Sequence, residues 1–576
     1  MCMENCKFIR FGAPMLLAIL PIVLLIPSLA ASSTTVRAMK DEAGYAGKPI
    51  SLHSGAESMK RTDLTIGTLF PISIERSYHS KSGYDSPLGY GWAHNYDKRL
   101  YTYADGSVII RKNTGWKRRF VASGQGFITP AGETGTLVKH ADDTYTWTEK
   151  DGAKEHYDVK GRLETITDAR GNAVVLSYES DSRAPLTGLL PANMNQSSPL
   201  VVAYDYRISM ITEISANAVP TGVSVVFQYD SSSGRLVSIT DSLGRSVSYT
   251  YDSIGNLTSV TTPTAKATYG YTNSSNKHFL TTIDEGDGTY TNTYDTYGRV
   301  AKQTHGTGII DFAYDLPHKK TTITTSIKDS AGTLLNTQTR TVEFDDLGQP
   351  IKVTDTLGNV TTYTRDSRTL VTREENWENT GTVTAPTLVL KTATDFTYDA
   401  SGNMLTKTEA QGTDAENTVT YTYEPVYNQV LTRTEKSVVT SSQYKTTTNT
   451  YDAYGSKTSS TESGLLGNGA PFSYTTTYQY DANGQITAID APRTDVQDVV
   501  TFTYASTSGF LTSMTQSNVG TTTFSDHDGL GNPRVVTDAN GNSFTYTYDQ
   551  AGRVLTAKAP GDTASTGSVK SFSLFS

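Results

Sequence analysis

The chain has 576 residues, enough for about four ordinary domains unless an internal repeat replaces them with one elongated array. Its 35 tyrosines, roughly double the usual share, and the lack of a long apolar stretch with a 3.6-residue period indicate a β-rich protein. The formal net charge of -9, with 19% charged residues, argues against nucleic acid as a partner unless a basic patch is present.

The first thirty residues differ in kind from the rest. Lys7 and Arg10 precede an apolar run at residues 15–26, and small residues follow it where a leader peptidase cleaves. This pattern predicts a signal peptide over residues 1–30 and a linker over 31–44. The protein is therefore expected to be exported and to be secreted, periplasmic or on the cell surface.

A retained membrane anchor is the alternative interpretation of this segment. Residues 11–31 are just long enough to span a bilayer, but Pro14, Pro21 and Pro27 favour a shorter, interrupted segment. Membrane contact is expected only if this segment is not cleaved.

After the linker, residues 45–150 are expected to form a small β-rich domain. One basic and aromatic cluster lies within it, at residues 116–120. We interpret this cluster mainly as a solvated strand end, with a phosphate or glycan contact as the alternative.

A short motif then repeats along the chain. Asp230, Asp241 and Asp252 are eleven residues apart, and each is followed by Gly-Arg or Gly-Asn. Asp at the first position of a turn accepts hydrogen bonds from N–H groups inside it, and Gly supplies the positive φ that a bulged hairpin turn requires. Each copy therefore predicts a hairpin turn.

Between these turns, apolar or aromatic residues alternate with Ser and Thr at a period of two, which is typical of strands with two different faces. Two strands and two turns give a repeat of about 22 residues. The sequence thus predicts an all-β fold, a long antiparallel meander over residues 155–556, with an irregular tail over 557–576. Longer loops are expected within 181–222, 367–394 and 408–418.

About ten Tyr-Asp-x-x-Gly-Arg/Asn units at this spacing resemble the YD repeats of Rhs (rearrangement hotspot) proteins. The segment before them resembles the small domain that precedes the repeats in many bacterial Rhs proteins, on these residues: Pro49, Leu52, Gly55, Thr62, Asp63, Leu64, Pro71, Arg76, Tyr78, Pro87, Leu88, Gly89, Gly91, Trp92 and Tyr96. The simpler explanation of these residues is structural, with turns and a small aromatic core.

The resemblance implies a sheet that winds as a spiral, or partial hollow shell, around a variable C-terminal toxin. This sequence is expected to lack the terminal core segment and the toxin, because one strand after Tyr548 leads into the tail. The expected partners are therefore a C-terminal effector or a polypeptide that supplies the missing shell strands.

Catalytic motifs are missing from the sequence. Both cysteines, Cys2 and Cys6, precede the predicted cleavage point, and no zinc-protease, serine-hydrolase or phosphate-loop pattern occurs. We predict no enzymatic activity, no catalytic or metal residues and no cofactor. The acidic segments 284–288 and 526–532 do not follow a calcium-loop spacing, so we interpret both as turns, with calcium binding as the alternative.

These observations predict an exported, non-catalytic YD-repeat scaffold that houses, displays or delivers an effector in contacts between cells or at cell surfaces. Two alternatives stay open at this point. One is an extracellular carbohydrate-binding or adhesion module that contacts cell-surface glycans, and the other is a truncated gene product without independent activity.

Overall fold

A computed structural model describes residues 44–112, 116–124, 126–130, 132–180, 206–410, 412–413, 415–437, 443–493, 495–560 and 570–571. The predicted signal peptide, with both cysteines, and most of the tail beyond residue 560 lie outside the described residues. All helices and strands assigned in the described residues are β-strands, 46 in total. This part of the chain contains no helix with the length and apolarity that a membrane span needs.

The first eleven strands form four small sheets, with the orders β1-β2, β3-β4-β7, β5-β6 and β11-β10-β9-β8. Their bounds are β1 Tyr45–Ala46, β2 Ile50–Ser51, β3 Ser58–Ile66, β4 Ile72–His79, β5 Asp85–Ser86, β6 Gly89–Tyr90, β7 Trp92–His94, β8 Arg99–Thr102, β9 Val108–Lys112, β10 Trp116–Ser123 and β11 Gly126–Ile128.

The other 35 strands form one antiparallel sheet in which each strand pairs with the next along the chain. Their bounds are β12 Thr136–Lys139, β13 Tyr145–Thr148, β14 Lys154–Tyr157, β15 Leu163–Thr167, β16 Ala173–Ser180, β17 Tyr206–Ile214, β18 Pro220–Tyr229, β19 Leu236–Asp241, β20 Ser246–Tyr251, β21 Leu257–Thr261, β22 Lys266–Gly270, β23 Thr282–Asp284, β24 Thr289–Tyr294, β25 Val300–His305, β26 Gly308–Asp315, β27 Lys320–Lys328, β28 Leu334–Phe344, β29 Pro350–Thr354, β30 Val360–Arg365, β31 Val371–Asn379, β32 Leu388–Tyr398, β33 Met404–Glu409, β34 Asn417–Tyr423, β35 Val430–Lys436, β36 Tyr444–Tyr451, β37 Lys457–Leu465, β38 Pro471–Tyr480, β39 Ile486–Asp490, β40 Val499–Tyr504, β41 Leu511–Gln516, β42 Gly520–His527, β43 Pro533–Thr537, β44 Ser543–Tyr548, β45 Val554–Lys558 and β46 Lys570–Ser571.

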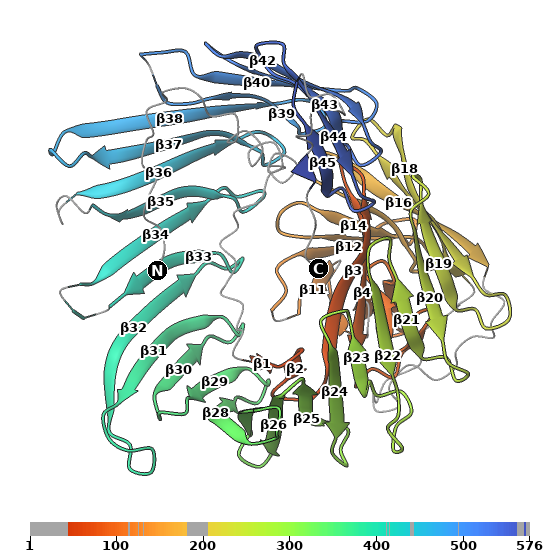
Figure 1. The fold of residues 1–576 in the computed structure, drawn as a ribbon. Coiled ribbons are helices and arrows are strands. Elements are labelled where there is room, and N and C mark those ends of the chain that lie inside the picture. Colours follow the sequence, from red (N-terminus) through yellow and green to blue (C-terminus); the bar gives the residue numbers. More distant parts are fainter. Residues whose placement is uncertain are drawn as a thin grey trace.

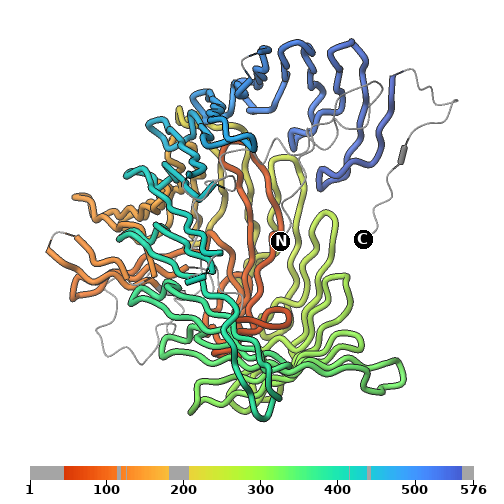
Figure 2. The backbone as a smooth tube through the Cα atoms, turned by 90° about the vertical axis from the view of Figure 1, so that its left-hand side faces the viewer, coloured from red at the N-terminus to blue at the C-terminus, as the bar shows by residue number. Residues whose placement is uncertain are grey.

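This architecture confirms the predicted all-β meander. The sheet curves continuously from β12 through β24 and β32 to β45, so that its late strands return towards its early ones (Figure 1). The N-terminal strands β3 and β4 lie inside this curve, and the view turned by 90° shows them between the two sides of the wall (Figure 2). The face that the sheet turns towards β3 and β4 is its concave face.

The long loop expected at 367–394 is wrong, because regular strands occupy most of it, whereas residues 181–205 of the loop expected within 181–222 lie outside the described residues. Residues 206–222 contain β17 and the start of β18, and residues 367–394 contain β31 and half of β32. The sequence of β31, "VTREENWEN", is polar on both faces, so it shows no period of two. Pairing across strands replaces apolar alternation there, since the Arg373 guanidinium donates to both carboxylate oxygens of Asp395 on β32 at 2.9 Å.

The third expected loop, at residues 408–418, is correct only in its middle. Thr408 and Glu409 end β33, and Asn417 begins β34. The described residues between them form the connecting turn.

Candidate functional site on the concave face

The turns that shape this face follow the chemistry expected of Asp-x-x-Gly-Arg. In the turn after β19, Asp241 Oδ1 accepts the backbone N–H of Arg245 at 2.9 Å, and Asp241 Oδ2 accepts its guanidinium N–H at 2.7 Å. Gly244, Gly255 and Gly552 have φ angles of +80°, +88° and +78°. These values confirm the predicted positive-φ positions, where a side chain would strain the backbone.

The tyrosine hydroxyl of most YD units makes a backbone contact that the sequence did not predict, although that of Tyr157 donates to the Glu155 carboxylate instead. The hydroxyl of Tyr251 donates to the carbonyl of Leu236 at 2.7 Å, and that of Tyr480 donates to the carbonyl of Lys457 at 2.8 Å. In both cases the acceptor is the first residue after the preceding turn on the same edge of the sheet. The same kind of link to a backbone carbonyl is made by Tyr178, Tyr229, Tyr294, Tyr314, Tyr398, Tyr423, Tyr451, Tyr504 and Tyr548.

Two units without tyrosine keep this link with another polar group. His527 Nε2 lies 2.9 Å from the Leu511 carbonyl oxygen, and Arg365 Nη2 donates to the Pro350 carbonyl at 3.3 Å. Histidine or arginine at the tyrosine position of the motif can therefore make the same contact, and this substitution is visible in the sequence. The link joins each turn to the preceding turn on the same edge of the sheet.

The first half of the concave face is covered by the N-terminal strands. Ile239 on β19 and Val247 on β20 are fully buried in one apolar cluster with Ile72, Ile74 and Trp92 of β4 and β7. A second cluster joins residues 50 and 52 to the inner faces of β25–β29. We call β16–β29 the covered half of the sheet.

The second half of the concave face, β30–β45, has a different lining, and we call it the open half. None of the buried apolar clusters in the described residues includes a residue of β30–β38. Tyr421 pairs with Arg433, and Arg433 pairs with Thr447, which places all three side chains on the concave face. The sheet is thus lined here with half-buried aromatic and charged side chains.

These charges are arranged as neighbouring pairs. The Arg433 guanidinium donates to both carboxylate oxygens of Glu435 at 2.7 Å, and these hydrogen bonds hold the pKa of Glu435 below its usual value. Lys407 pairs with Glu409 on β33. The open half therefore presents charge of both signs, which suits polar and peptide-like contacts better than a purely apolar ligand.

A seam of turn-to-turn contacts closes the curve on itself. Arg170, in the turn after β15, pairs with Asp452 and donates to the Ser456 hydroxyl at 2.9 Å, more than 280 residues further along the chain. The Asn172 side chain donates to the carbonyl of Asn483 at 2.9 Å. Lys150 likewise contacts Asn403 at 3.0 Å. These contacts place the open half against the beginning of the sheet.

The two acidic segments considered for calcium are engaged by the protein itself. Glu285 accepts the Arg61 guanidinium, and Asp287 accepts the Lys48 ammonium group. In the second segment, Asp528 Oδ1 caps its own turn by accepting the Asn532 N–H at 2.9 Å. In the described part of the chain, no group of three His, Cys, Asp or Glu side chains could hold a metal ion.

The basic and aromatic cluster at 116–120 belongs to β10, which pairs with β9 and β11. Phe120 is fully buried, and Arg118 pairs with Glu133 and stacks over Trp147, so Arg118 and Phe120 contribute to packing. The expected solvated strand end is therefore wrong for these two residues, because their side chains face the core beneath β13.

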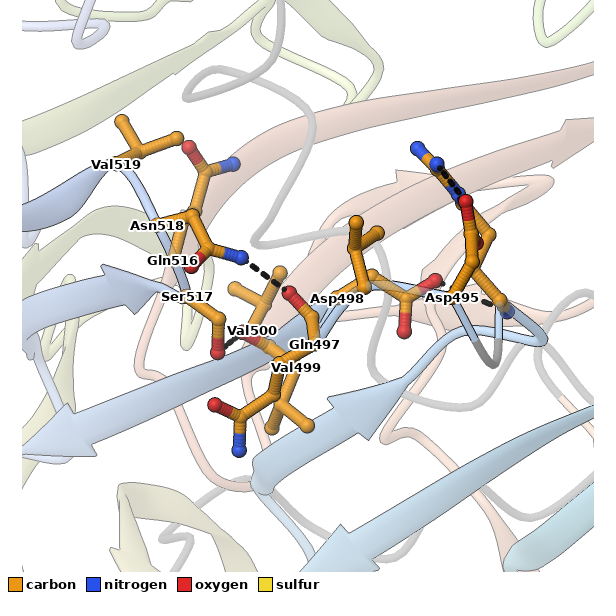
Figure 3. Close-up of a pocket in the computed structure, with 11 residues that line it drawn as sticks. Asp495, Gln497, Asp498, Val499, Val500, Gln516, Ser517, Asn518 and Val519 are labelled. Atoms are coloured by element: carbon orange, nitrogen blue, oxygen red, sulfur yellow. Dashed lines mark hydrogen bonds and ion pairs between the residues drawn. The ribbon is translucent and has the colours of Figure 1, made fainter.

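A hollow of about 710 Å³ lies at one edge of the open half, between the loop before β40 and the turn after β41. Arg493 and Asp495 on its wall pair with each other, and the Asn518 side chain donates to the Gln497 carbonyl at 2.9 Å (Figure 3). Arg493, Asp495 and Asn518 are thus engaged within the hollow, and we place the candidate site on the concave face instead.

Comparison with known proteins identifies the architecture. Residues 139–574 match the teneurin YD-shell family, which is most of the chain and nearly the whole meander. The chain belongs to the teneurin YD-shell family. This confirms the YD-repeat resemblance read from the sequence. The N-terminal segment, residues 47–120, matches a domain of unknown function (DUF6531).

The relatives of this YD-shell chain are larger proteins. Teneurin-m of Drosophila melanogaster is 35% identical over 106 residues, which are 18% of this chain and 4% of that protein. The Photorhabdus luminescens Tc holotoxin pore is 14% identical with a TM-score of 0.42, over 89% of this chain and 29% of that chain. A TcdB2-TccC3 complex is 14% identical with a TM-score of 0.35, over 94% and 34%. The chain thus spans about a third or less of each.

Proposed function

We propose that this YD-shell chain is a non-catalytic scaffold whose open half holds a polypeptide effector against the concave face. The observation that carries the proposal is the division of that face. The N-terminal strands fill the covered half, whereas the open half keeps half-buried tyrosines and paired charges directed inwards. Such a lining can bind an extended polypeptide through many weak polar and aromatic contacts, and these contacts do not require the polypeptide to have a particular sequence.

The seam supports the same role. Arg170 and Lys150 tie the beginning of the sheet to β33–β37, so the open half is held as a curved wall. A curved wall surrounds a bound polypeptide on several sides, which increases the number of contacts and shields the polypeptide from proteases.

Site-specific photo-crosslinking tests this proposal. An unfolded polypeptide of about 100 residues would be appended after Ser576, and a photoreactive phenylalanine analogue would replace either Tyr474 or Ser473. Tyr474 pairs with Glu462 on the concave side and is 46% exposed, while the adjacent Ser473 points to the opposite face. We expect crosslinks to the appended polypeptide from position 474 and few from position 473. Equal yields at the two positions would refute the proposal.

We also propose that the scaffold acts outside the cytoplasm, displaying or delivering its effector in contacts between cells. The charged and apolar pattern of residues 1–30 supports export. Fusion of residues 1–36 to a reporter should carry it out of the cytoplasm, and N-terminal sequencing should begin near Ala31. Recovery of intact Met1 in the membrane fraction would show an anchor instead.

A further inference from the structure

Glu57 occupies an unusual position between the N-terminal strands and the meander. It precedes β3, and its backbone is fixed by hydrogen bonds to Ser80, with the Glu57 N–H donating to the Ser80 hydroxyl at 3.0 Å. Its side chain is completely buried against Tyr294 of β24, and Oε1 has no hydrogen-bond partner in the described residues. A buried carboxylate normally has a cationic or hydrogen-bonding partner for each oxygen.

The hydrogen bonds around Tyr294 require one more proton than its own hydroxyl supplies. Tyr294 Oη lies 3.0 Å from Glu57 Oε2 and 2.8 Å from the carbonyl oxygen of Leu280. A single phenolic proton can be donated to only one of these acceptors. If Glu57 is a neutral acid, its O–H donates to Tyr294 and the Tyr294 O–H donates to Leu280, so both contacts are satisfied.

The surroundings of Glu57 also favour its neutral form. The titratable groups that face it are the phenols of Tyr78, Tyr271 and Tyr294, whose pKa values are raised by burial. The neutral amide of Asn292 also lies near Glu57. Burial raises the pKa of Glu57 to about 8, and the nearby Tyr294 hydroxyl and Asn292 amide only partly oppose this effect.

We propose that protonated Glu57 is a latch that holds the N-terminal strands on the covered half, and that loss of its proton weakens this contact. An acid whose pKa is raised in the folded state contributes stability that is fully present below its ordinary value of 4.5. That contribution is lost as the pH rises from 4.5 to about 8. Release would begin beside Glu57 and would lift residues 50 and 52 from the inner faces of β25–β29.

Infrared difference spectroscopy tests the protonation state in the unmodified chain. The carbonyl stretch of a protonated buried carboxyl should be present at about pH 6, disappear by about pH 9.5, and be absent at both pH values in Glu57→Gln. A wild-type spectrum without this band at about pH 6, or with a band that persists unchanged to about pH 9.5, would overturn the proposal even if the variant failed to fold.

Hydrogen exchange at Ile50 and Ser51 tests the release, after correction for the intrinsic pH dependence of exchange. In the wild type, the equilibrium constant for opening should rise about tenfold for each pH unit between 4.5 and 8, as one released proton requires. In Glu57→Gln the opening should be independent of pH. Glu285→Gln is the matched control, because Glu285 also joins this interface but is paired with Arg61, and it should keep the wild-type pH dependence. Equal pH dependence in wild type and Glu57→Gln would overturn the latch.

Discussion

The covered and open halves of the meander use the same turns but line the concave face differently. In the covered half, Leu257 follows its turn and is fully buried under the N-terminal strands. In the open half, Leu511 holds the equivalent position and is only half-buried, in a small cluster formed within the sheet itself. Turns and tyrosine links thus recur along the sheet, while the lining of its concave face differs between the two halves.

The largest expected effect comes from truncating these two leucines. Leu257→Ala should cost about 3 kcal/mol, since it removes fully buried methyl groups and leaves a cavity between two packed layers. Leu511→Ala should cost about 1 kcal/mol, because water already reaches part of that side chain. Denaturant unfolding of both variants measures the difference, and equal losses would show that the open half is packed as tightly as the covered half.

The turns should respond alike in the two halves. Gly244 and Gly541 have φ angles of +80° and +83°, and a Cβ atom at either position would meet nothing within 4 Å. Gly→Ala at each should therefore cost only backbone strain, about 1 to 2 kcal/mol. Thermal unfolding checks this, with Ser253→Ala, at an exposed turn position, as a control expected within about 0.5 kcal/mol of the wild type. A loss of stability at only one of the two glycines would mean that the lining of the sheet, and not the turn, determines the effect of the substitution.

The tyrosine links should give the smallest effects. Tyr480→Phe should cost about 1 kcal/mol by removing one hydrogen bond to a backbone carbonyl. Tyr251→Phe should cost somewhat more, because its hydroxyl also lies 3.2 Å from the Pro87 carbonyl of the N-terminal segment. Phe344, which holds the same motif position naturally, shows that the ring fits without the hydroxyl. Unchanged unfolding midpoints in both variants would show that the tyrosine links do not stabilise the fold.

Much of the fold could be predicted from the sequence because its determinants are local. The Asp241 turn needs only residues within five positions of one another, and the period of two in β20 reports which face is buried. That pattern fails at β31, where Arg373 pairs with Glu375 on the same strand and with Asp395 on β32 instead of being buried. Cross-strand pairing of this kind leaves no periodic signal within a single strand.

The candidate site was less accessible to sequence reasoning. Whether a lining residue is covered depends on strands far away, as with Ile239, which shares a buried cluster with Ile72 and Ile74 of β4. The seam also depends on residues that are distant in the sequence. Nothing beside Arg170 in the sequence indicates that Asp452 will lie against it. Nothing in the sequence around Glu57 indicates that its carboxyl is buried beside Tyr294.

Thiol labelling on the concave face tests most directly the claim that half of this face is covered and half is open. With Cys2 and Cys6 replaced by Ser, single cysteines would be placed at Val247, which is fully buried, and at Tyr474, which is 46% exposed. We predict that Tyr474→Cys reacts with a small thiol reagent at close to the rate of a free thiol, whereas Val247→Cys reacts only when the chain unfolds. Protection of both positions, or rapid reaction at both, would contradict it.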